Sequence, residues 1–273
     1  MRHVDLKDKV VIITGGTSGI GLSLAKVFAS YGTKTVIASI DKDYLTPLED
    51  KFHKDGKEIL TMYADVTKED DCKKIIDLTI EKYGRIDILV NNAGISMRAL
   101  FKDLKLDVLK KLIDTNFWGM VYCTYYALPH LLESKGTVVG ISSVAGYKGL
   151  PGRTGYAASK FAMVGFLETL RIEHSCDGLH VLIVAPWFTR SNIRNAALGP
   201  DGSPQGVSPR KEEKMVSPDW VARRIVRGVV RKRKKMVLTL KGKLFLLINT
   251  IFPSLIDRLT YNELSKEQDS PLK

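Results

Sequence analysis

The chain has 273 residues, of which 44% are hydrophobic and 26% are charged. This length and composition exclude a mini-protein, a disordered chain and a collagen-like chain, and leave one large domain or two small ones. The 42 Lys and Arg residues outnumber the 30 Asp and Glu residues, and the resulting net charge of +12 by itself suggests a nucleic acid, an anionic membrane or an acidic ligand as partner.

Short apolar or β-branched runs alternate along the chain with longer stretches of helical period. The runs that predict strands are residues 10–14, 35–38, 59–63, 86–90, 137–141, 181–184 and 236–240. Nearly continuous apolar runs indicate strands that are covered on both faces, and this alternation is typical of right-handed βαβ units. The sequence therefore predicts an α/β fold, a single doubly wound domain of the Rossmann type with a seven-stranded parallel sheet and helices on both faces.

The first predicted strand ends in a glycine-rich turn, Thr14-Gly15-Gly16-Thr17-Ser18-Gly19-Ile20-Gly21, and a helical pattern follows it. Glycines at such positions allow a tight turn, bring backbone N–H groups against a pyrophosphate and let the helix pack closely on the strand. The position of the turn in a βαβ array predicts dinucleotide binding. The expected contacts are Gly15, Thr17, Ser18, Gly19, Ile20 and Gly21.

Polar motifs follow the third, fourth and fifth predicted strands. They are Asp65-Val66, Asn91-Asn92-Ala93-Gly94 and Ser143, and Tyr156-x-x-x-Lys160 begins 13 residues after Ser143. A single Tyr-x-x-x-Lys match is weak in a chain with 10 tyrosines and many lysines. The complete ordered set, over about residues 6–240, resembles the short-chain dehydrogenase/reductase superfamily.

This resemblance implies an NAD(P)(H)-dependent oxidoreductase. Its catalytic residues would be Asn116, Ser143, Tyr156 and Lys160. Tyr156 would exchange a proton with the substrate oxygen, which Ser143 would hydrogen-bond. Lys160 lies four residues after Tyr156 and so on the same helix face, where an ammonium lowers the pKa of a phenol toward the range useful for acid–base catalysis. Lys160 would also hold the nicotinamide ribose, and Asn116 would hold a water that links Lys160 to solvent. Two structural alternatives remain open: Ser143 caps a turn, and Asn116 bonds only backbone within a bent helix.

The resemblance also assigns cofactor contacts beyond the glycine turn. These are Ser39, Asp65, Val66, Asn92, Ala93, Gly94, Tyr156, Lys160, Pro186, Thr189 and Ser191. After the sixth strand the family's usual glycine is replaced by Trp187, and Ser191 stands in place of the usual threonine. Trp187 therefore either changes the geometry of these contacts or forms a wall of the substrate pocket.

The end of the second strand bears on the choice between NAD(H) and NADP(H). An NAD enzyme usually has a carboxylate there that accepts hydrogen bonds from the adenosine ribose. Ser39 stands in the place of that acid, and Ile40 in the place of an arginine that would favour a 2′-phosphate. Asp41 could still reach a ribose, whereas Ser39 with Lys42 would tolerate a phosphate, and we expect NADP(H) to be preferred over NAD(H).

The substrate pocket is expected to be mostly apolar. Its predicted lining is Val144, Ala145, Gly146, Tyr147, Leu150, Pro151, Ile95 and Met97. This favours a hydrophobic ketone or aldehyde and its alcohol, such as a steroid, retinoid or lipid-like carbonyl, and the pattern is similar to the hydroxysteroid-dehydrogenase-like branch. The alternative is a non-catalytic dinucleotide-binding regulator or scaffold that acts through its basic C-terminal segment.

Residues 1–243 are predicted to form the catalytic domain, with a mobile substrate loop at about 187–217, and residues 244–273 an apolar or amphipathic extension. Residues 223–243 hold ten cations and no acid, so most of the net charge lies in this one segment. A basic run before an apolar tract predicts peripheral membrane contact through residues 223–256, the alternative being helices packed on the core or on a second subunit. We expect no nucleic acid partner, because the run lacks interleaved aromatics, and by resemblance we expect a dimer or tetramer.

The cysteines Cys72, Cys123 and Cys176 are scattered and form no C-x-x-C pair. Neither a disulfide framework nor a metal site is expected. No signal peptide is visible in residues 1–9, and the longest apolar tract, 244–256, is shorter than the ~20 residues that span a bilayer. These features predict a cytoplasmic protein, and peripheral contact with a membrane surface remains open.

Overall fold

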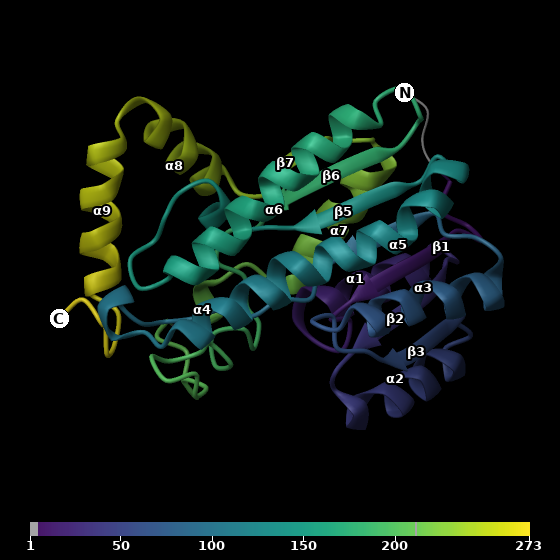
Figure 1. Cartoon of the computed structure of the whole chain (residues 1–273), viewed down its shortest axis with the longest axis horizontal. Coiled ribbons are helices and arrows are strands. Elements are labelled where there is room, and N and C mark those ends of the chain that lie inside the picture. Colours follow the sequence, from purple (N-terminus) through teal and green to yellow (C-terminus); the bar gives the residue numbers. More distant parts are fainter. Residues whose placement is uncertain (1–4, 211) are drawn as a thin grey trace.

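A computed structural model describes residues 5–210 and 212–273, and within them seven parallel strands form one sheet (Figure 1). The strands are β1 (Val10–Thr14), β2 (Lys34–Ser39), β3 (Ile59–Tyr63), β4 (Ile88–Asn91), β5 (Thr137–Ile141), β6 (His180–Ala185) and β7 (Lys235–Val237). Their order is β3-β2-β1-β4-β5-β6-β7, so the connections reverse direction between β1 and β4. In an open parallel sheet, ligands bind at this reversal, outside the carboxyl ends of the strands.

Helices cover both faces of the sheet, which confirms the predicted fold class. They are α1 (Gly19–Ser30), α2 (Lys42–Lys54), α3 (Glu69–Tyr83), α4 (Leu106–Ile113), α5 (Gly119–Glu133), α6 (Thr154–Glu173), α7 (Pro218–Val230), α8 (Leu240–Ile251) and α9 (Pro253–Ser265). Shorter helical turns are η1 (Phe101–Asp103), η2 (Asp114–Trp118), η3 (Val144–Gly146) and η4 (Glu212–Lys214). Residues 1–4 of the predicted catalytic domain lie outside the described residues.

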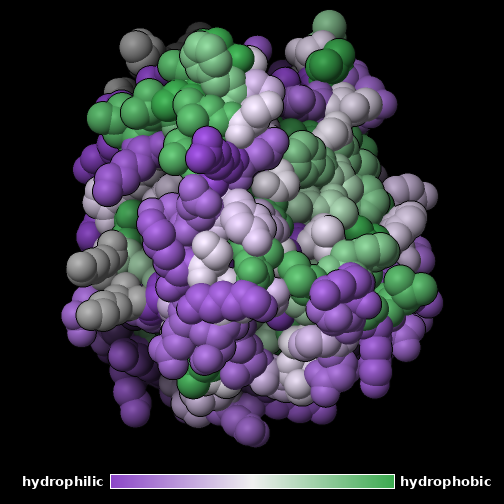
Figure 2. Space-filling view, turned by 90° about the vertical axis from the view of Figure 1, so that its left-hand side faces the viewer, coloured by the Kyte–Doolittle hydropathy of each residue, from purple (hydrophilic) through white to green (hydrophobic). Residues whose placement is uncertain are grey.

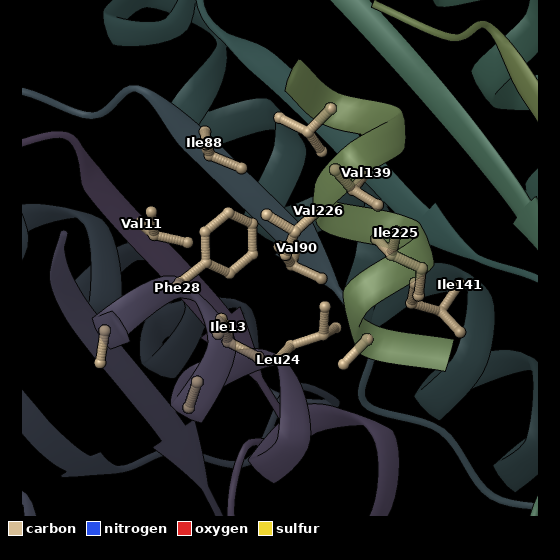
Figure 3. Packing of buried hydrophobic residues seen from close by; sticks show 14 of the residues in the cluster. Val11, Ile13, Leu24, Phe28, Ile88, Val90, Val139, Ile141, Ile225 and Val226 are labelled. Atoms are coloured by element: carbon tan, nitrogen blue, oxygen red, sulfur yellow. The ribbon is translucent and has the colours of Figure 1, made fainter. Parts of the chain in front are cut away.

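The two faces of the sheet carry separate apolar cores. On one face α1, α2 and α7 contribute to a cluster in which Phe28 packs among Val11, Ile88 and Val226 (Figure 3). On the other face α3, α5 and α6 cover the strands. β1 is buried along its whole length, as expected for a central strand covered on both sides. The rigid double core fixes the strand ends that carry the polar motifs.

The last predicted strand is too long, because the chain turns into a helix earlier than its apolar pattern indicates. β7 ends at Val237, and Thr239 caps α8 by accepting a hydrogen bond from the backbone N–H of Gly242 at 3.1 Å. Threonine is a favoured N-cap residue because its hydroxyl oxygen can accept a hydrogen bond from a backbone N–H of the first helical turn. Leu240 is thus the first residue of a helix rather than the last of a strand.

Helices α8 and α9 lie at the end of the molecule opposite α2 and β3 (Figure 1). α8 packs on the segment after β6, with the rings of Phe245 and Trp187 5.4 Å apart. α9 is tied to the loop after β5 by an ion pair between Asp257 and Lys148. Within the described ranges no helix has both the length and the apolar character needed to cross a membrane.

Candidate active site

A cavity of about 900 Å³ opens at the carboxyl ends of the central strands. Loops after β1, β2, β3, β4, β5 and β6 all contribute to its walls, as the reversal of strand order leads one to expect. Every residue that the sequence singled out for catalysis or cofactor binding lines this cavity, except Gly21 and Asn116. The fold therefore brings together motifs that are separated by up to 176 positions in the chain, from Gly15 to Ser191.

The glycine turn forms a cradle at the N-terminus of α1. Gly15 and Gly19 have φ angles of 64° and 53°, a region that residues with a side chain rarely adopt. Gly21 does not line the cavity, but a Cβ there would clash with the carbonyl oxygen of Gly15 and with the Asn92 amide. The side chain of Ser18, at the N-cap of α1, makes no capping hydrogen bond in this structure. A helix N-terminus with glycines before it fits the pyrophosphate of a dinucleotide.

The Asn-Asn-Ala-Gly motif after β4 braces this cradle. Asn92 Nδ2 donates to the carbonyl oxygens of Thr14 and Gly15, both at 2.9 Å. The hydroxyl of Thr14 in turn accepts from the backbone N–H groups of Asn92 and Ala93 at 3.1 Å. Asn91 does not contact the glycine turn in this way; its Nδ2 donates a hydrogen bond to Thr124 Oγ1 in α5 at 3.0 Å. The motif thus supports the turn and joins the sheet to α5.

A small polar network forms the end of the cavity that lies beside β2. Thr17 Oγ1 donates to the Asp41 carboxylate at 2.6 Å and lies 2.9 Å from Ser39 Oγ. Asp41 lines the cavity, together with Ser39 and Asp65. Lys42 does not line it, and its Nζ lies 4.4 Å from the ring centroid of Tyr63. The sequence left the role of Asp41 open, and the structure shows that Asp41 is the charged residue lining the cavity directly after β2.

Tyr156 and Lys160 lie at the other end of the cavity, on α6. Burial raises the pKa of Tyr156 above its ordinary value, while a hydrogen bond with Ser143 acts in the opposite direction on that pKa. Burial also lowers the pKa of Lys160 to about 8. Lys160 Nζ donates to the carbonyl oxygen of Ile141 at 2.9 Å and lies 5.8 Å from the centre of the Tyr156 ring.

Two arginines that the sequence reasoning missed, Arg153 and Arg194, share this end of the cavity. Both line it, both are buried, and their positive charges lower the pKa of Tyr156 in part. Arg194 donates to the carbonyl oxygen of Thr189 at 2.8 Å and pairs with Glu212 at 3.1 Å. Arg153 lies at the N-cap of α6, three residues before Tyr156, so its closeness to Tyr156 is a local feature of the chain. Arg194 belongs to the loop after β6, and no local motif predicts its position beside Tyr156.

Ser143 occupies the position at the end of β5 that both of its predicted roles require. Its Oγ accepts a hydrogen bond from the backbone N–H of Ala145 at 3.1 Å and so caps the short turn η3. Ser143 also lines the cavity, and it lies near enough to Tyr156 to lower the pKa of that phenol in part. The capping role and the position beside Tyr156 are therefore compatible.

Asn116 lies in η2, a π-helical turn between α4 and α5. Its Oδ1 accepts from the Ile95 N–H at 2.8 Å, and its Nδ2 donates to the Ile95 carbonyl at 3.0 Å and to Ser159 Oγ at 2.9 Å. The side chain is buried, and it holds the loop after β4 in place. This differs from the alternative in which Asn116 bonds only backbone within its own helix, because its partners are the backbone of Ile95 and the side chain of Ser159. Single π-helical turns are frequent at functional sites. Here the turn aims Asn116 at the loop that borders Tyr156.

The apolar wall of the cavity differs in part from the predicted one. Ile95, Val144 and Leu150 line it as expected, together with Trp187 and Phe188. Met97 does not, because it is fully buried in a separate cluster with Leu112 and Leu198. The predicted residues Ala145, Gly146, Tyr147 and Pro151 also lie outside the lining. Of the two alternatives for Trp187, its position fits a wall residue.

Comparisons with known proteins agree with this arrangement. The family model described as short chain dehydrogenase matches residues 9–199. The chain is 36% identical over 268 residues to 11-beta-hydroxysteroid dehydrogenase 1A of Arabidopsis thaliana, and this match covers 94% of this chain and 76% of the relative. It is 34% identical over 262 residues to dehydrogenase/reductase SDR family protein 7-like of Dictyostelium discoideum, with 93% and 81% covered.

Solved structures share the fold at lower sequence identity. A short chain dehydrogenase/reductase from Burkholderia phymatum, in complex with NAD, has a TM-score of 0.83 at 21% identity and covers 92% of this chain and 96% of its own. An alcohol dehydrogenase from Thermococcus sibiricus, complexed with 5-hydroxy-NADP, has a TM-score of 0.74 at 23% identity, with 84% and 95% covered. Together with the family model and the ordered motifs, these comparisons establish that the chain belongs to the short-chain dehydrogenase family, in its hydroxysteroid-dehydrogenase-like branch, and is an NAD(P)-dependent oxidoreductase that acts on CH–OH and C=O groups.

Proposed function

We propose that the enzyme interconverts a hydrophobic ketone or aldehyde and its alcohol, with Tyr156 as the general acid and base. One observation carries the proposal: Ser143, Tyr156 and Lys160 meet at the end of the cavity whose wall is built from Val144, Leu150, Trp187 and Phe188. A carbonyl oxygen bound by Ser143 and Tyr156 would place the rest of its molecule against apolar side chains. The name of the Arabidopsis thaliana relative, a hydroxysteroid dehydrogenase, supports a steroid-like or lipid-like substrate.

The chain's own residues then divide the chemistry of the carbonyl between them. When bound, the nicotinamide dinucleotide supplies the hydride in reduction and accepts it in oxidation. Ser143 donates a hydrogen bond to the substrate oxygen and stabilises the negative charge that develops on it. Tyr156, kept protonated by burial, gives its proton to that oxygen in reduction and takes it back in oxidation. Lys160 holds the ribose next to the nicotinamide and, as a cation, favours the phenolate form of Tyr156.

For the cofactor, the contacts at β2 outweigh our expectation of NADP(H), and we propose a preference for NAD(H). Asp41 presents a carboxylate to the cavity, which would accept from a ribose hydroxyl and repel a 2′-phosphate. The cation that was expected to tolerate that phosphate, Lys42, lies against Tyr63 instead. The donor-rich cradle of Gly15, Gly19 and α1 suits the pyrophosphate of either cofactor.

The test is a hydride-transfer screen of hydrophobic ketones and alcohols against NADH, NADPH and their oxidised forms. We expect turnover of bulky carbonyl compounds, faster with NADH than with NADPH at equal concentration. Tight dinucleotide binding without turnover of any compound in a broad panel would instead favour the non-catalytic regulator. No contact among the described residues supports that alternative, since the residues that acid–base chemistry needs are present and adjacent.

We further propose that α8 and α9 rest on an anionic membrane surface. Four exposed apolar side chains of α8, namely Leu240, Leu244, Leu247 and Ile251, recur at the spacing of one helical face. Exposed apolar side chains continue on and beside α9, at Phe252, Leu255 and Leu259. Figure 2 views this end of the molecule and shows hydrophobic patches bordered by hydrophilic side chains. The basic run of residues 223–243 precedes this face in the chain, the arrangement that suits acidic lipid headgroups.

A further inference from the structure

The chain beyond α9 returns to the end of the cavity that holds Tyr156, which we call the substrate end, and buries a carboxylate near it. Glu267 follows α9 by two residues and is only 8% exposed. Close by, Ser270 is buried and its hydroxyl donates to the Leu264 carbonyl at 2.8 Å, while the ring of Pro271 lies against Gly152. A buried carboxylate is costly unless cations and hydrogen bonds compensate it, so its partners show what it holds.

Three arginines from three different segments surround the Glu267 carboxylate. Arg210 Nε donates to Glu267 Oε1 at 2.5 Å. Arg98 Nη2 and Arg153 Nη2 lie 3.6 Å and 4.0 Å from Glu267 Oε2. Arg98 is also bound to the same stretch of chain through its donation to the Gln268 carbonyl at 2.6 Å. Residues 267–268 therefore join the loop after β4, the start of α6 and the loop after β6.

Each of these arginines is attached to a part of the cavity wall. Arg153 lines the cavity itself and donates to the Met97 carbonyl at 3.2 Å. The guanidinium of Arg210 stacks 3.9 Å from the ring centroid of Phe188, which lines the apolar wall. The backbone N–H of Arg98 donates to the carbonyl of Leu198, another wall residue, at 2.8 Å. The position of the Glu267 carboxylate is thus linked to both sides of the substrate pocket.

We propose that Glu267 is a positioning residue, which closes the substrate end of the cavity by holding these three arginine-bearing segments together. This inference rests on the proposed function, because it concerns where the hydrophobic substrate binds. Without the carboxylate, Arg98, Arg153 and Arg210 would be mutually repelling cations in a poorly solvated place. The segments would then move apart, and the wall made by Phe188 and Leu198 would lose its fixed position.

The substitution Glu267→Gln removes the charge with little change in shape, and Glu267→Asp keeps the charge on a shorter stem. Glu263→Gln is the matched control, since Glu263 lies exposed near the end of the same helix α9. The substrate probes are the bulkiest ketone that the wild type reduces and cyclohexanone. We expect Glu267→Gln to raise KM for the bulky ketone about tenfold, with kcat and the KM for cofactor changed less than threefold, in line with the loss of ~1.4 kcal/mol of binding per factor of ten. Glu267→Asp should recover part of the loss, and Glu263→Gln should behave as wild type.

Amide hydrogen exchange gives a readout that needs no substrate. In Glu267→Gln, but not in Glu263→Gln, exchange should speed up within residues 95–99 and 188–210 while the strands keep their protection. Unchanged exchange together with an unchanged KM would overturn the proposal. If wild type reduces no carbonyl compound, the proposed function fails, and the exchange result alone then decides whether Glu267 holds these segments. If Glu267→Gln does not fold, Arg210→Met removes the same contact from its more exposed side and must produce the same exchange pattern.

Discussion

Burial changes the acid–base behaviour of two residues on α6, Tyr156 and Lys160, in opposite senses. It raises the pKa of the Tyr156 phenol and lowers the pKa of the Lys160 ammonium to about 8. The phenol is therefore protonated at neutral pH, which suits donation to a carbonyl oxygen. In the direction of oxidation the phenolate is needed, so the rate should continue to rise into the alkaline range.

Replacement of Tyr156 by Phe removes the transferred proton but keeps the ring in place. We expect kcat to fall by about 10²–10⁴-fold, the usual contribution of a positioned acid or base. Dinucleotide affinity, measured by titration calorimetry, should change little, because the phenol hydroxyl is only one of many expected cofactor contacts and the glycine turn before α1 is unchanged. Tyr44→Phe, an exposed position on α2, is the control. Near-normal turnover of Tyr156→Phe would refute the assignment.

Asp41 is the residue on which the proposed cofactor preference depends. Asp41→Asn removes the charge that would repel a 2′-phosphate, and it weakens the hydrogen bond from Thr17. We expect the ratio of kcat/KM for NADH over NADPH to fall by about tenfold, the size of one charge-assisted hydrogen bond. Steady-state kinetics with both cofactors provide the measurement. A ratio that does not move would mean that Asp41 does not face the ribose.

At the scale of elements, His180 links β6 to the turn before β7. Its Nε2 donates to the Arg233 carbonyl at 2.9 Å, and burial, with the nearby charge of Lys232, lowers its pKa to about 4 from an ordinary value of 6.5. Between pH 6.5 and 4, His180 is protonated in the unfolded chain but stays neutral in the folded chain. The free energy of unfolding should therefore fall as the pH falls through this window, by up to about 3 kcal/mol.

The substitution His180→Gln keeps a neutral donor for the Arg233 carbonyl but does not titrate. Urea unfolding at pH 7 and at pH 4.5 should show a smaller loss of stability on acidification for this variant than for wild type. His130→Gln, on α5, is the control and should lose as much as wild type. Equal pH dependence in all three proteins would show that His180 does not contribute.

Most of the elements could be predicted from the sequence because their information is local. The all-apolar run of β1 favours a buried strand, and the glycines after it favour a tight turn. Both features are local, and so are the motifs that follow the strands. β7 was predicted too long because Leu240 continues the apolar run, whereas the cap at Thr239 decides the boundary. Met97 was misplaced for a similar reason, since an apolar residue near a site fits a core as well as a pocket.

At the scale of the whole molecule, long-range pairing is what the sequence could not reveal. Arg98, Arg153 and Arg210 look like ordinary surface cations in the chain, and Glu267 lies far from all three. Only the path of α8 and α9 brings them together beside the apolar wall. The net charge of +12 has the opposite character: it looks global but lies mostly in residues 223–243.

This localised charge and the apolar face of α8 together predict how the molecule binds a surface. Co-sedimentation with vesicles that contain phosphatidylglycerol should show binding that weakens as salt rises, because lipid charge and Lys or Arg attract each other through a screened field. The double substitution Leu244→Glu with Leu247→Glu should reduce binding at least tenfold, since it places two acids on the face that would enter the headgroup region. Vesicles of phosphatidylcholine alone should bind much less.

Ile172→Glu, at an apolar position on α6 that is at least as exposed as Leu244 and Leu247, is the matched control and should bind as wild type. Sedimentation velocity of the same proteins separates the membrane from a second subunit as the occupant of this face. If wild type is an oligomer that the α8 double substitution converts to monomer, and vesicle binding is absent, the face is a subunit interface. If the oligomeric state is the same in both proteins while vesicle binding is lost only in the α8 variant, the exposed stripe acts at the lipid surface.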